Sequence, residues 1–153
     1  MRVGLTVLLS AVLSASLLAQ APQEKGSAKR YGIELRLKKF PQSTPKETLA
    51  SVVLAIQERN FAYLLAELAD PNFVDKRVKD NHGGSFDEFV KEASMKIADN
   101  PSGVKELEQF LQAGEWEETG NSATAKLKDF KDRQVFFRKI GDRWFMENKQ
   151  KAE

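Results

Sequence analysis

The spacing of hydrophobic and polar positions divides the chain into a helical part followed by a part made of strands. From Pro45 onwards apolar residues recur at positions i, i+3, i+4 and i+7, the spacing of one buried helix face. Thr44 and Glu47 have the spacing of a capping box, and Pro45 suits the first helical turn. The apolar spacing returns in three later stretches, so the pattern predicts four helices. The stripes are Leu49, Val52, Val53 and Ile56; Phe61, Leu64, Leu65 and Leu68; Phe86, Phe89, Val90, Ala93 and Ile97; and Val104, Leu107, Phe110 and Leu111.

After Gly114 the helical spacing gives way to alternation of apolar and polar residues. Gly114 itself is predicted to end the last helix in the left-handed conformation. Gly120-Asn121 and Gly141-Asp142 have the composition of tight turns, so we expect an antiparallel meander. Phe136 and Phe137 are neighbours, which means that both faces of the last hairpin are covered: one by helices, the other by a partner or by an N-terminal strand. The predicted strands are residues 115–119, 122–128, 133–140 and 143–148.

Two further segments have weaker patterns. In residues 31–40, Ile33, Leu35 and Leu37 alternate with charged residues, which predicts an N-terminal strand. Residues 72–78 fit a short strand or an irregular crossing, and the turn formers of residues 79–84 predict a surface loop. The order of elements predicts an α+β fold, in which an N-terminal strand and three to four helices pack on a C-terminal antiparallel sheet.

The N-terminal residues have the pattern of a targeting segment. Arg2 precedes an apolar run that ends in the small residues Ala19-Gln20-Ala21, so residues 1–21 are predicted to be a signal peptide. The run is shorter than the roughly 20 residues that a membrane-spanning helix needs. We therefore expect export to the periplasm or the medium, and no membrane span unless the leader is retained. Residues 22–30 are predicted to be a flexible linker, and residues 31–150 a single domain.

Pro22 complicates the removal of this leader. It follows Ala21 directly, and a tertiary amide is a poor bond for a peptidase to cleave. An alternative role for the protein is therefore an interaction module that an uncleaved leader tethers to the cell envelope.

The composition excludes several classes of site. The chain of 153 residues has no Cys and one His, so it lacks disulfides, thiolate nucleophiles and cysteine or histidine-rich metal sites. We predict no metal and no cofactor, and the sequence has none of the common nucleotide, zinc or serine-hydrolase motifs. Lys and Arg number 24 against 22 Asp and Glu, so no strong overall charge favours a nucleic acid partner.

The last hairpin carries a family resemblance. The order of helices followed by strands, ending in residues 135–146 with Gly141-Asp142-Arg143-Trp144, resembles the nuclear-transport-factor-2-like (SnoaL-like) superfamily over residues 44–148. Residues 40–75 are also similar to uncharacterised exported bacterial proteins of this build. The resemblance implies a curved sheet that wraps around the helices to form a cone with a pocket. Enzymes of the superfamily place an Asp/His or Asp/Tyr pair inside the cone, whereas the one His of this chain falls in a glycine-rich loop.

Several side chains are candidates for chemistry. Asp80 and His82 could form an acid/base pair, the basis of an alternative reading as a SnoaL-like hydrolase or isomerase. A solvated turn is the simpler interpretation of the same residues. Asp70 and Asp75 flank Pro71 and could bind a hard cation, but they lack the ligand spacing of a calcium loop, so capping is favoured.

Aromatic residues supply the candidates for ligand binding. Tyr63, Trp116 and Trp144 each combine an apolar body with a polar tip and could line a pocket, or could belong to the core. The leading hypothesis is an exported, non-catalytic domain that binds a small apolar ligand or a protein partner through a cone cavity or a sheet face.

Charged residues gather in two stretches of opposite sign. The basic stretch could touch anionic envelope polymers or lipid head groups, or could protect an edge from aggregation. The acidic stretch complements it, which makes a homodimer conceivable. The basic residues are Lys25, Lys29, Arg30, Arg36, Lys38 and Lys39; the acidic residues are Glu106, Glu108, Glu115, Glu117 and Glu118.

Overall fold

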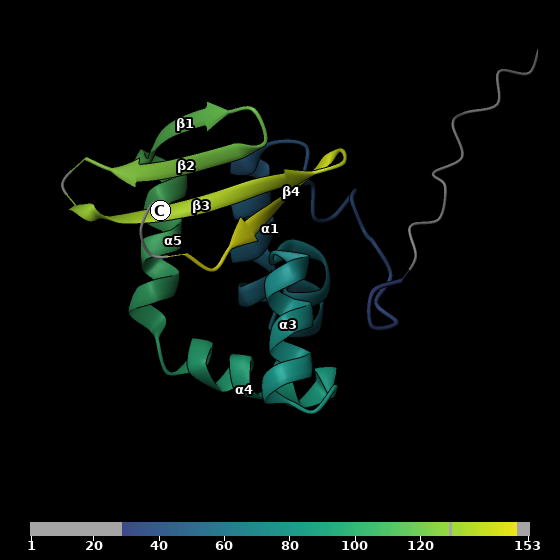
Figure 1. The fold of residues 1–153 in the computed structure, drawn as a ribbon. Helices are drawn as coiled ribbons and strands as arrows, with labels where there is room; N and C mark the ends of the chain where they lie inside the picture. The colour runs from purple at the N-terminus through teal and green to yellow at the C-terminus, as the bar shows by residue number, and fades with distance from the viewer. Residues whose placement is uncertain (1–28, 129, 150–153) are drawn as a thin grey trace, which may run out of the picture.

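The computed structural model describes residues 29–128 and 130–149. The predicted signal peptide and nearly all of the predicted linker lie outside the described residues. The fold is α+β, as predicted: helices come first in the chain, and a four-stranded antiparallel sheet with the order β1-β2-β3-β4 follows (Figure 1). The elements are α1 (Pro45–Gln57), α2 (Phe61–Tyr63), the π-helix η1 (Leu64–Leu68), α3 (Pro71–Asn81), α4 (Phe86–Ala98), α5 (Pro101–Ala113), β1 (Glu115–Thr119), β2 (Ser122–Leu127), β3 (Phe130–Ile140) and β4 (Arg143–Glu147).

Local capping fixes where the long helices begin. The Thr44 hydroxyl accepts from the Glu47 N–H while the Glu47 carboxylate accepts from the Thr44 N–H, which confirms the capping box of α1. Ser85 caps α4 through the Glu88 N–H, and Asn100 caps α5 through the Gly103 N–H. None of the described helices is long and apolar enough to cross a membrane.

The prediction for residues 72–78 was wrong, because they belong to helix α3 rather than to a strand or an irregular crossing. Asp70 caps this helix, its carboxylate accepting from the Asn72 N–H at 2.8 Å, and Pro71 takes the first helical position. This is the same combination of cap and proline that begins α1. The helix also runs to Asn81, so the predicted loop of residues 79–84 shortens to a turn around His82.

The predicted N-terminal strand is likewise absent. Tyr31 and Gly32 have φ angles of 51° and 76° and form a tight turn that the Arg30–Ile33 hydrogen bond closes. Burial still alternates beyond the turn, since Ile33, Leu35 and Leu37 are half-buried between exposed charged residues. The alternation of apolar and charged residues therefore predicted correctly which side chains face inwards. A strand does not form because the segment packs on the helices, where no neighbouring strand offers a hydrogen-bonding edge.

The sheet is the meander that the sequence predicts. Tight turns at Gly120 and Gly141, both with positive φ, join consecutive strands. The prediction for Gly114 was wrong in its conformation, because this residue has an ordinary φ of −68°. The glycine is required for space instead: a Cβ atom there would lie 2.4 Å from the carbonyl oxygen of Phe110.

One face of the sheet packs on α1 and α5, which lie behind it in Figure 1. Phe137 and Trp144 are almost completely buried on this face and meet Leu49 of α1 and Phe110 of α5. A second contact joins the sheet to the other helices. Ala69, directly after η1, pairs in parallel with Met146 of β4, and the Asp70 N–H donates to the Met146 carbonyl at 2.9 Å.

Candidate functional site

An apolar cavity of about 500 Å³ lies among α1, η1, α4, α5 and β4. In Figure 1, α3 and α5 extend from the sheet on two sides, and α4 crosses between their far ends. We call this hollow the central cavity. Its lining is mostly aliphatic, and Lys96, Asn100, Glu147 and Asn148 supply the polar groups. The apolar lining comprises Val52, Ile56, Leu64, Leu65, Ala69, Phe73, Ile97, Val104, Leu107 and Met146.

A second hollow, of about 600 Å³, adjoins the central cavity. The two share Ile56, Ile97 and Val104 as lining residues, so these side chains form a common wall. We call the second hollow the side groove. Its remaining lining combines apolar side chains, among them Phe61 and Met95, with polar ones: Arg59, Ser94, Lys105 and Glu108.

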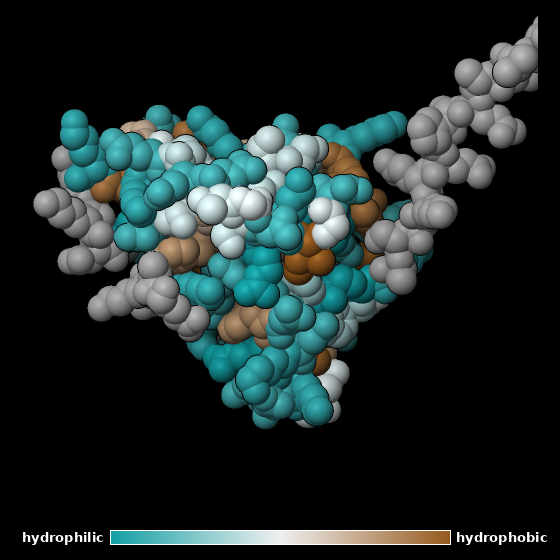
Figure 2. Space-filling view, turned by 45° about the horizontal axis from the view of Figure 1, so that its top comes forward, coloured by the Kyte–Doolittle hydropathy of each residue, from teal (hydrophilic) through white to brown (hydrophobic). Residues whose placement is uncertain are grey.

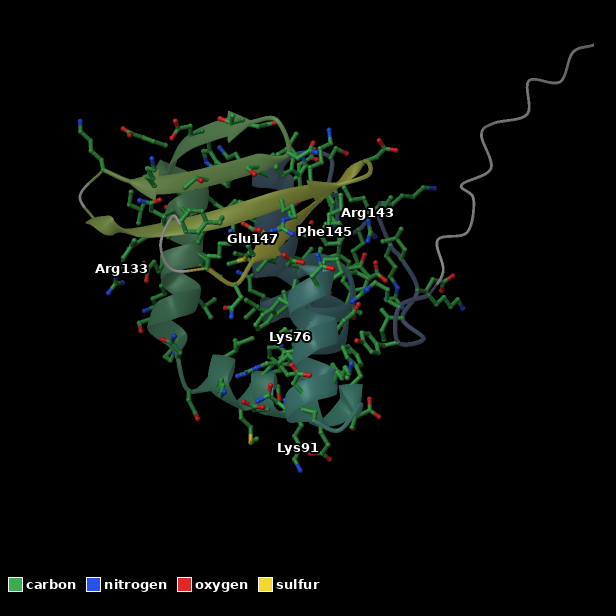
Figure 3. The ribbon with its side chains drawn as sticks, in the orientation of Figure 1. Lys76, Lys91, Arg133, Arg143, Phe145 and Glu147 are labelled. Carbon is green, nitrogen blue, oxygen red and sulfur yellow. The ribbon has the colours of Figure 1, made fainter. Side chains whose placement is uncertain are left out.

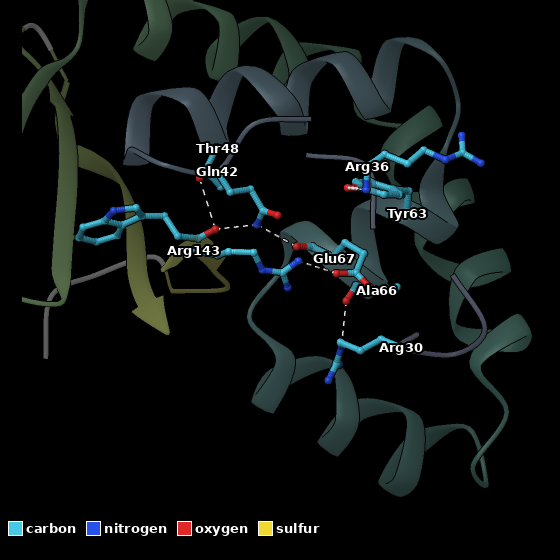
Figure 4. Close-up of polar contacts among 9 residues, drawn as sticks. Arg30, Arg36, Gln42, Thr48, Tyr63, Ala66, Glu67 and Arg143 are labelled. Carbon is cyan, nitrogen blue, oxygen red and sulfur yellow. Dashed lines mark hydrogen bonds and ion pairs between the residues drawn. The ribbon is translucent and has the colours of Figure 1, made fainter. Parts of the chain in front are cut away.

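Buried polar groups join η1 to the sheet beside the central cavity (Figure 4). The Gln42 amide donates to the carbonyls of Glu67 and Trp144 at 2.9 and 2.8 Å, and the Trp144 N–H donates to the Gln42 carbonyl at 3.0 Å. The Glu67 carboxylate is 1% exposed and accepts from Arg143 at 2.8 Å. Because Glu67 is buried and Arg143 is largely buried, this pair fixes the position of η1 against β4.

A row of charged groups continues along the other face of β4. Arg143, Phe145 and Glu147 follow one another on that face (Figure 3), with the Arg143 guanidinium 4.7 Å from the Phe145 ring centroid. Arg138 of β3 pairs with Glu147 at 2.9 Å and lies 3.8 Å from the Asp70 carboxylate. All three acidic side chains of this region, Glu67 included, therefore have a basic partner, and the row is neutralised within the fold.

Comparison of the chain with known protein families, curated proteins and solved structures found no match.

The predicted ligand-binding aromatics do not come together at these hollows. Tyr63 and Trp144 are 2% and 1% exposed and belong to two separate core clusters. Tyr63 stacks on Phe40, and its hydroxyl accepts from the Arg36 N–H at 3.1 Å (Figure 4). Burial raises the pKa of Tyr63 above its ordinary value. Trp116 packs against Phe137, and its indole N–H is buried without an acceptor among the described residues.

The predicted acid/base pair is also separated. Asp80 forms an ion pair with Lys76 of the same helix at 2.6 Å. The His82 ring, with its side chain only 11% exposed, packs on Phe89, and its Nε2 lies 2.9 Å from a Glu92 carboxylate oxygen of α4. Glu92 also pairs with Lys96, whose hydrogen bond is the main cause that lowers the pKa of Glu92. His82 therefore joins the C-terminal end of α3 to the middle of α4 rather than pairing with Asp80.

Asp70 and Asp75 serve different parts of the fold. Asp70 is the cap of α3, as the sequence favoured, whereas Asp75 anchors the N-terminal segment. Arg30 and the Tyr31 hydroxyl both donate to the Asp75 carboxylate, at 2.6 and 2.7 Å, and the Tyr31 ring stacks on Phe86 at 4.0 Å. Within the described part of the chain no group of His, Cys, Asp and Glu side chains could hold a metal ion.

Sequence reasoning missed the residues that line the hollows. Ile97 and Val104 were recognised only as members of apolar stripes, although they remain half-buried and form the common wall. Glu67 carried a usable signal, because it is a single acid inside the apolar run Leu64–Leu68. An acid at such a position needs a buried basic partner, and Arg143 is that partner.

Proposed function

We propose that this domain is a non-catalytic binding protein that takes a small apolar ligand into the central cavity. The observation that carries the proposal is the cavity itself, an aliphatic space of about 500 Å³ between the helices and the sheet. Small-molecule sites have volumes of roughly 300 to 1,000 Å³ and are mostly apolar with few polar groups. The cone-like architecture and the kinship with nuclear-transport-factor-2-like domains belong to the same proposal.

The physical driving force for such binding is removal of apolar surface from water. Each Å² of apolar surface that is buried contributes about 25 cal/mol. Polar groups occur only at Lys96, Asn100, Glu147 and Asn148, of which Lys96 and Glu147 already have ion-pair partners. The ligand is therefore held mainly by its shape and apolar surface, and no pair of free acid and base faces it.

A cavity-filling substitution tests this proposal. Val104 lines both hollows from α5, so Val104→Trp places a large ring in the space that the ligand needs. We expect N-phenylnaphthylamine, an uncharged dye that fluoresces in apolar surroundings, to bind the natural protein and to bind the variant at least about tenfold more weakly. Gln112→Trp, at an exposed position of the same helix, is the matched control and should bind the dye normally. Equal binding by the Val104 variant and the natural protein would rule out the cavity as the site.

Export is a separate part of the proposal, and it rests on the N-terminal sequence alone. Mass spectrometry of the protein recovered from the periplasm or medium should show that the chain has been cleaved, near Ala21 or at an earlier position within the leader. An N-terminus at Met1 on the recovered protein would favour the tethered module instead.

A further inference from the structure

The side groove carries positive charge that the fold leaves unpaired. Arg59 and Lys105 line it, and neither side chain forms a hydrogen bond or ion pair with any residue of the described ranges. The groove also has one acid, Glu108, which accepts a hydrogen bond from the Gln57 amide at 3.0 Å and keeps its charge, so two cations face one anion in the lining. Both cations are exposed at the rim, next to the apolar wall that the groove shares with the central cavity.

The backbone of Arg59 shows how this cation is placed at the end of α1. Its φ is 55°, in the left-handed region, directly after the C-cap of α1. Glycine is the residue that takes this position without steric strain. The chain instead places a long cationic side chain there, at the edge of an apolar hollow and without a partner. The Arg59 N–H donates to the Ile56 carbonyl and the Asn60 N–H to the Ala55 carbonyl, the Schellman pattern of a helix C-terminus, so this backbone belongs to the cap of α1.

We propose that the ligand is a single-chain amphiphile with an anionic head, such as a fatty carboxylate. This inference rests on the proposed function and names its ligand class. The carboxylate binds Arg59 and Lys105 at the rim of the side groove. The hydrocarbon chain packs on Phe61 and on the common wall of Ile97 and Val104, towards the central cavity. A guanidinium and an ammonium are the groups that bind a carboxylate. The apolar wall contacts the hydrocarbon chain of the ligand.

Calorimetric titration with three amphiphiles of equal chain length, all below their micellar concentrations, tests the head group. Dodecanoate, dodecanol and dodecylammonium share one hydrocarbon chain and differ in charge. We expect the natural protein to bind dodecanoate about tenfold more tightly than dodecanol. Two exposed ion pairs together strengthen binding by about this much. Dodecylammonium should bind more weakly than dodecanol.

Two substitutions then assign the preference to the cations. Arg59→Gly with Lys105→Gln should bring the affinity for dodecanoate down to that for dodecanol and leave the affinity for dodecanol unchanged. Arg59→Gly also removes the left-handed strain, so the midpoint of thermal unfolding should rise, and loss of binding cannot then be ascribed to unfolding. Lys91→Gln, on the exposed face of α4 (Figure 3) and outside both hollows, is the control and should retain the preference.

The outcomes separate the two proposals. If none of the three amphiphiles binds while N-phenylnaphthylamine does, the inference is overturned and the apolar-ligand function stands; if the dye does not bind either, both fail. If dodecanol binds as tightly as dodecanoate, or if the double variant keeps the preference, the cavity binds ligands but the cations do not select them, and the inference is overturned. Binding only to vesicles of anionic phospholipid, without binding of dodecanoate, would likewise overturn it, because the occupant would then be a membrane surface.

Discussion

At the scale of single residues, the pair of Glu67 and Arg143 is the most consequential contact. Their side chains are 1% and 19% exposed, and they join the π-helix to the last strand. Removing one member leaves a charge in a place that water reaches poorly. The pair therefore constrains the fold more strongly than any of the exposed ion pairs do.

We expect Glu67→Ala to lower the free energy of unfolding by about 3 to 5 kcal/mol, because the Arg143 guanidinium loses its partner. Urea denaturation measures this change. Lys126→Ala breaks the exposed pair with Glu117 and should cost less than about 1 kcal/mol. The double variant of Glu67 and Arg143 should be more stable than the sum of the single changes predicts. Simple additivity would show that the two side chains do not interact.

The contact of Asp75 with Arg30 and Tyr31 depends on pH. Burial alone would raise the pKa of Asp75, but the hydrogen bonds from Arg30 and Tyr31 outweigh it and hold the pKa below its ordinary value. A lowered pKa means that this contact stabilises the fold above about pH 4, the range of an unfolded Asp, and loses that contribution as the pH falls through the folded value. Stability curves of the natural protein and of Asp75→Asn should therefore differ modestly at neutral pH and converge in acid.

Tyr31 provides a check at the alkaline end. Burial and the hydrogen bond to Asp75 raise the pKa of Tyr31 to about 12. Its contribution is therefore complete below about pH 10 and is lost as the pH rises through 12. In Asp75→Asn the tyrosinate absorption should develop at lower pH. An unchanged alkaline titration in that variant would refute the proposed contact.

At the scale of elements, the joint between α5 and β1 has no room for a side chain at Gly114. Gly114 has an ordinary φ, yet a Cβ atom would lie 2.4 Å from the Phe110 oxygen. Helix and strand can follow each other this closely only because Gly114 has no side chain. The sequence marks the position correctly, but steric crowding rather than left-handed geometry is the reason for the glycine.

We expect Gly114→Ala to lower the free energy of unfolding by about 1 to 3 kcal/mol, since the backbone at the joint must shift. Thermal or urea unfolding measures this change. Gln112→Ala, at an exposed neighbouring position, should change stability by no more than about 0.5 kcal/mol. A Gly114 variant as stable as the natural protein would show that the joint relaxes without strain.

Element prediction succeeded where a local signal was sufficient. The capping box at Thr44 and Glu47 and the glycine turns of the sheet act over a few residues, so the sequence alone reveals them. Residues 31–40 show the limit of this approach. Their alternation correctly identifies the inward side chains, but a strand also requires a partner edge, and the sequence of the segment does not contain that information.

At the scale of the whole molecule, the candidate site was the least predictable feature. Periodicity shows that Ile97 and Val104 face inwards; it does not show whether other side chains fill the space between the helices. The predicted aromatics Tyr63 and Trp144 do fill their surroundings, whereas the smaller aliphatic side chains leave the central cavity. Binding therefore depends on how α4 and α5 are placed relative to each other. The sequence of neither helix alone contains that information.

Among the described residues, the surface that faces the viewer in Figure 2 shows no single large apolar area. In this view, which brings the sheet end forward, hydrophobic residues form small separate patches among hydrophilic ones. Scattered apolar residues of this kind are normal on a monomer surface. This favours the cavity over the sheet face as the place where an apolar ligand is held.

The reciprocal bonds between Gln42 and Trp144 set an order of events during synthesis. These residues are separated by 102 positions, and Trp144 belongs to the last strand. While a ribosome still covers the C-terminal segment, the Gln42 amide can bind the Glu67 carbonyl, but its bonds with Trp144 cannot form. The finished core thus arises only after Trp144 has left the ribosome, and until then the polypeptide stays open to any chaperone that meets it.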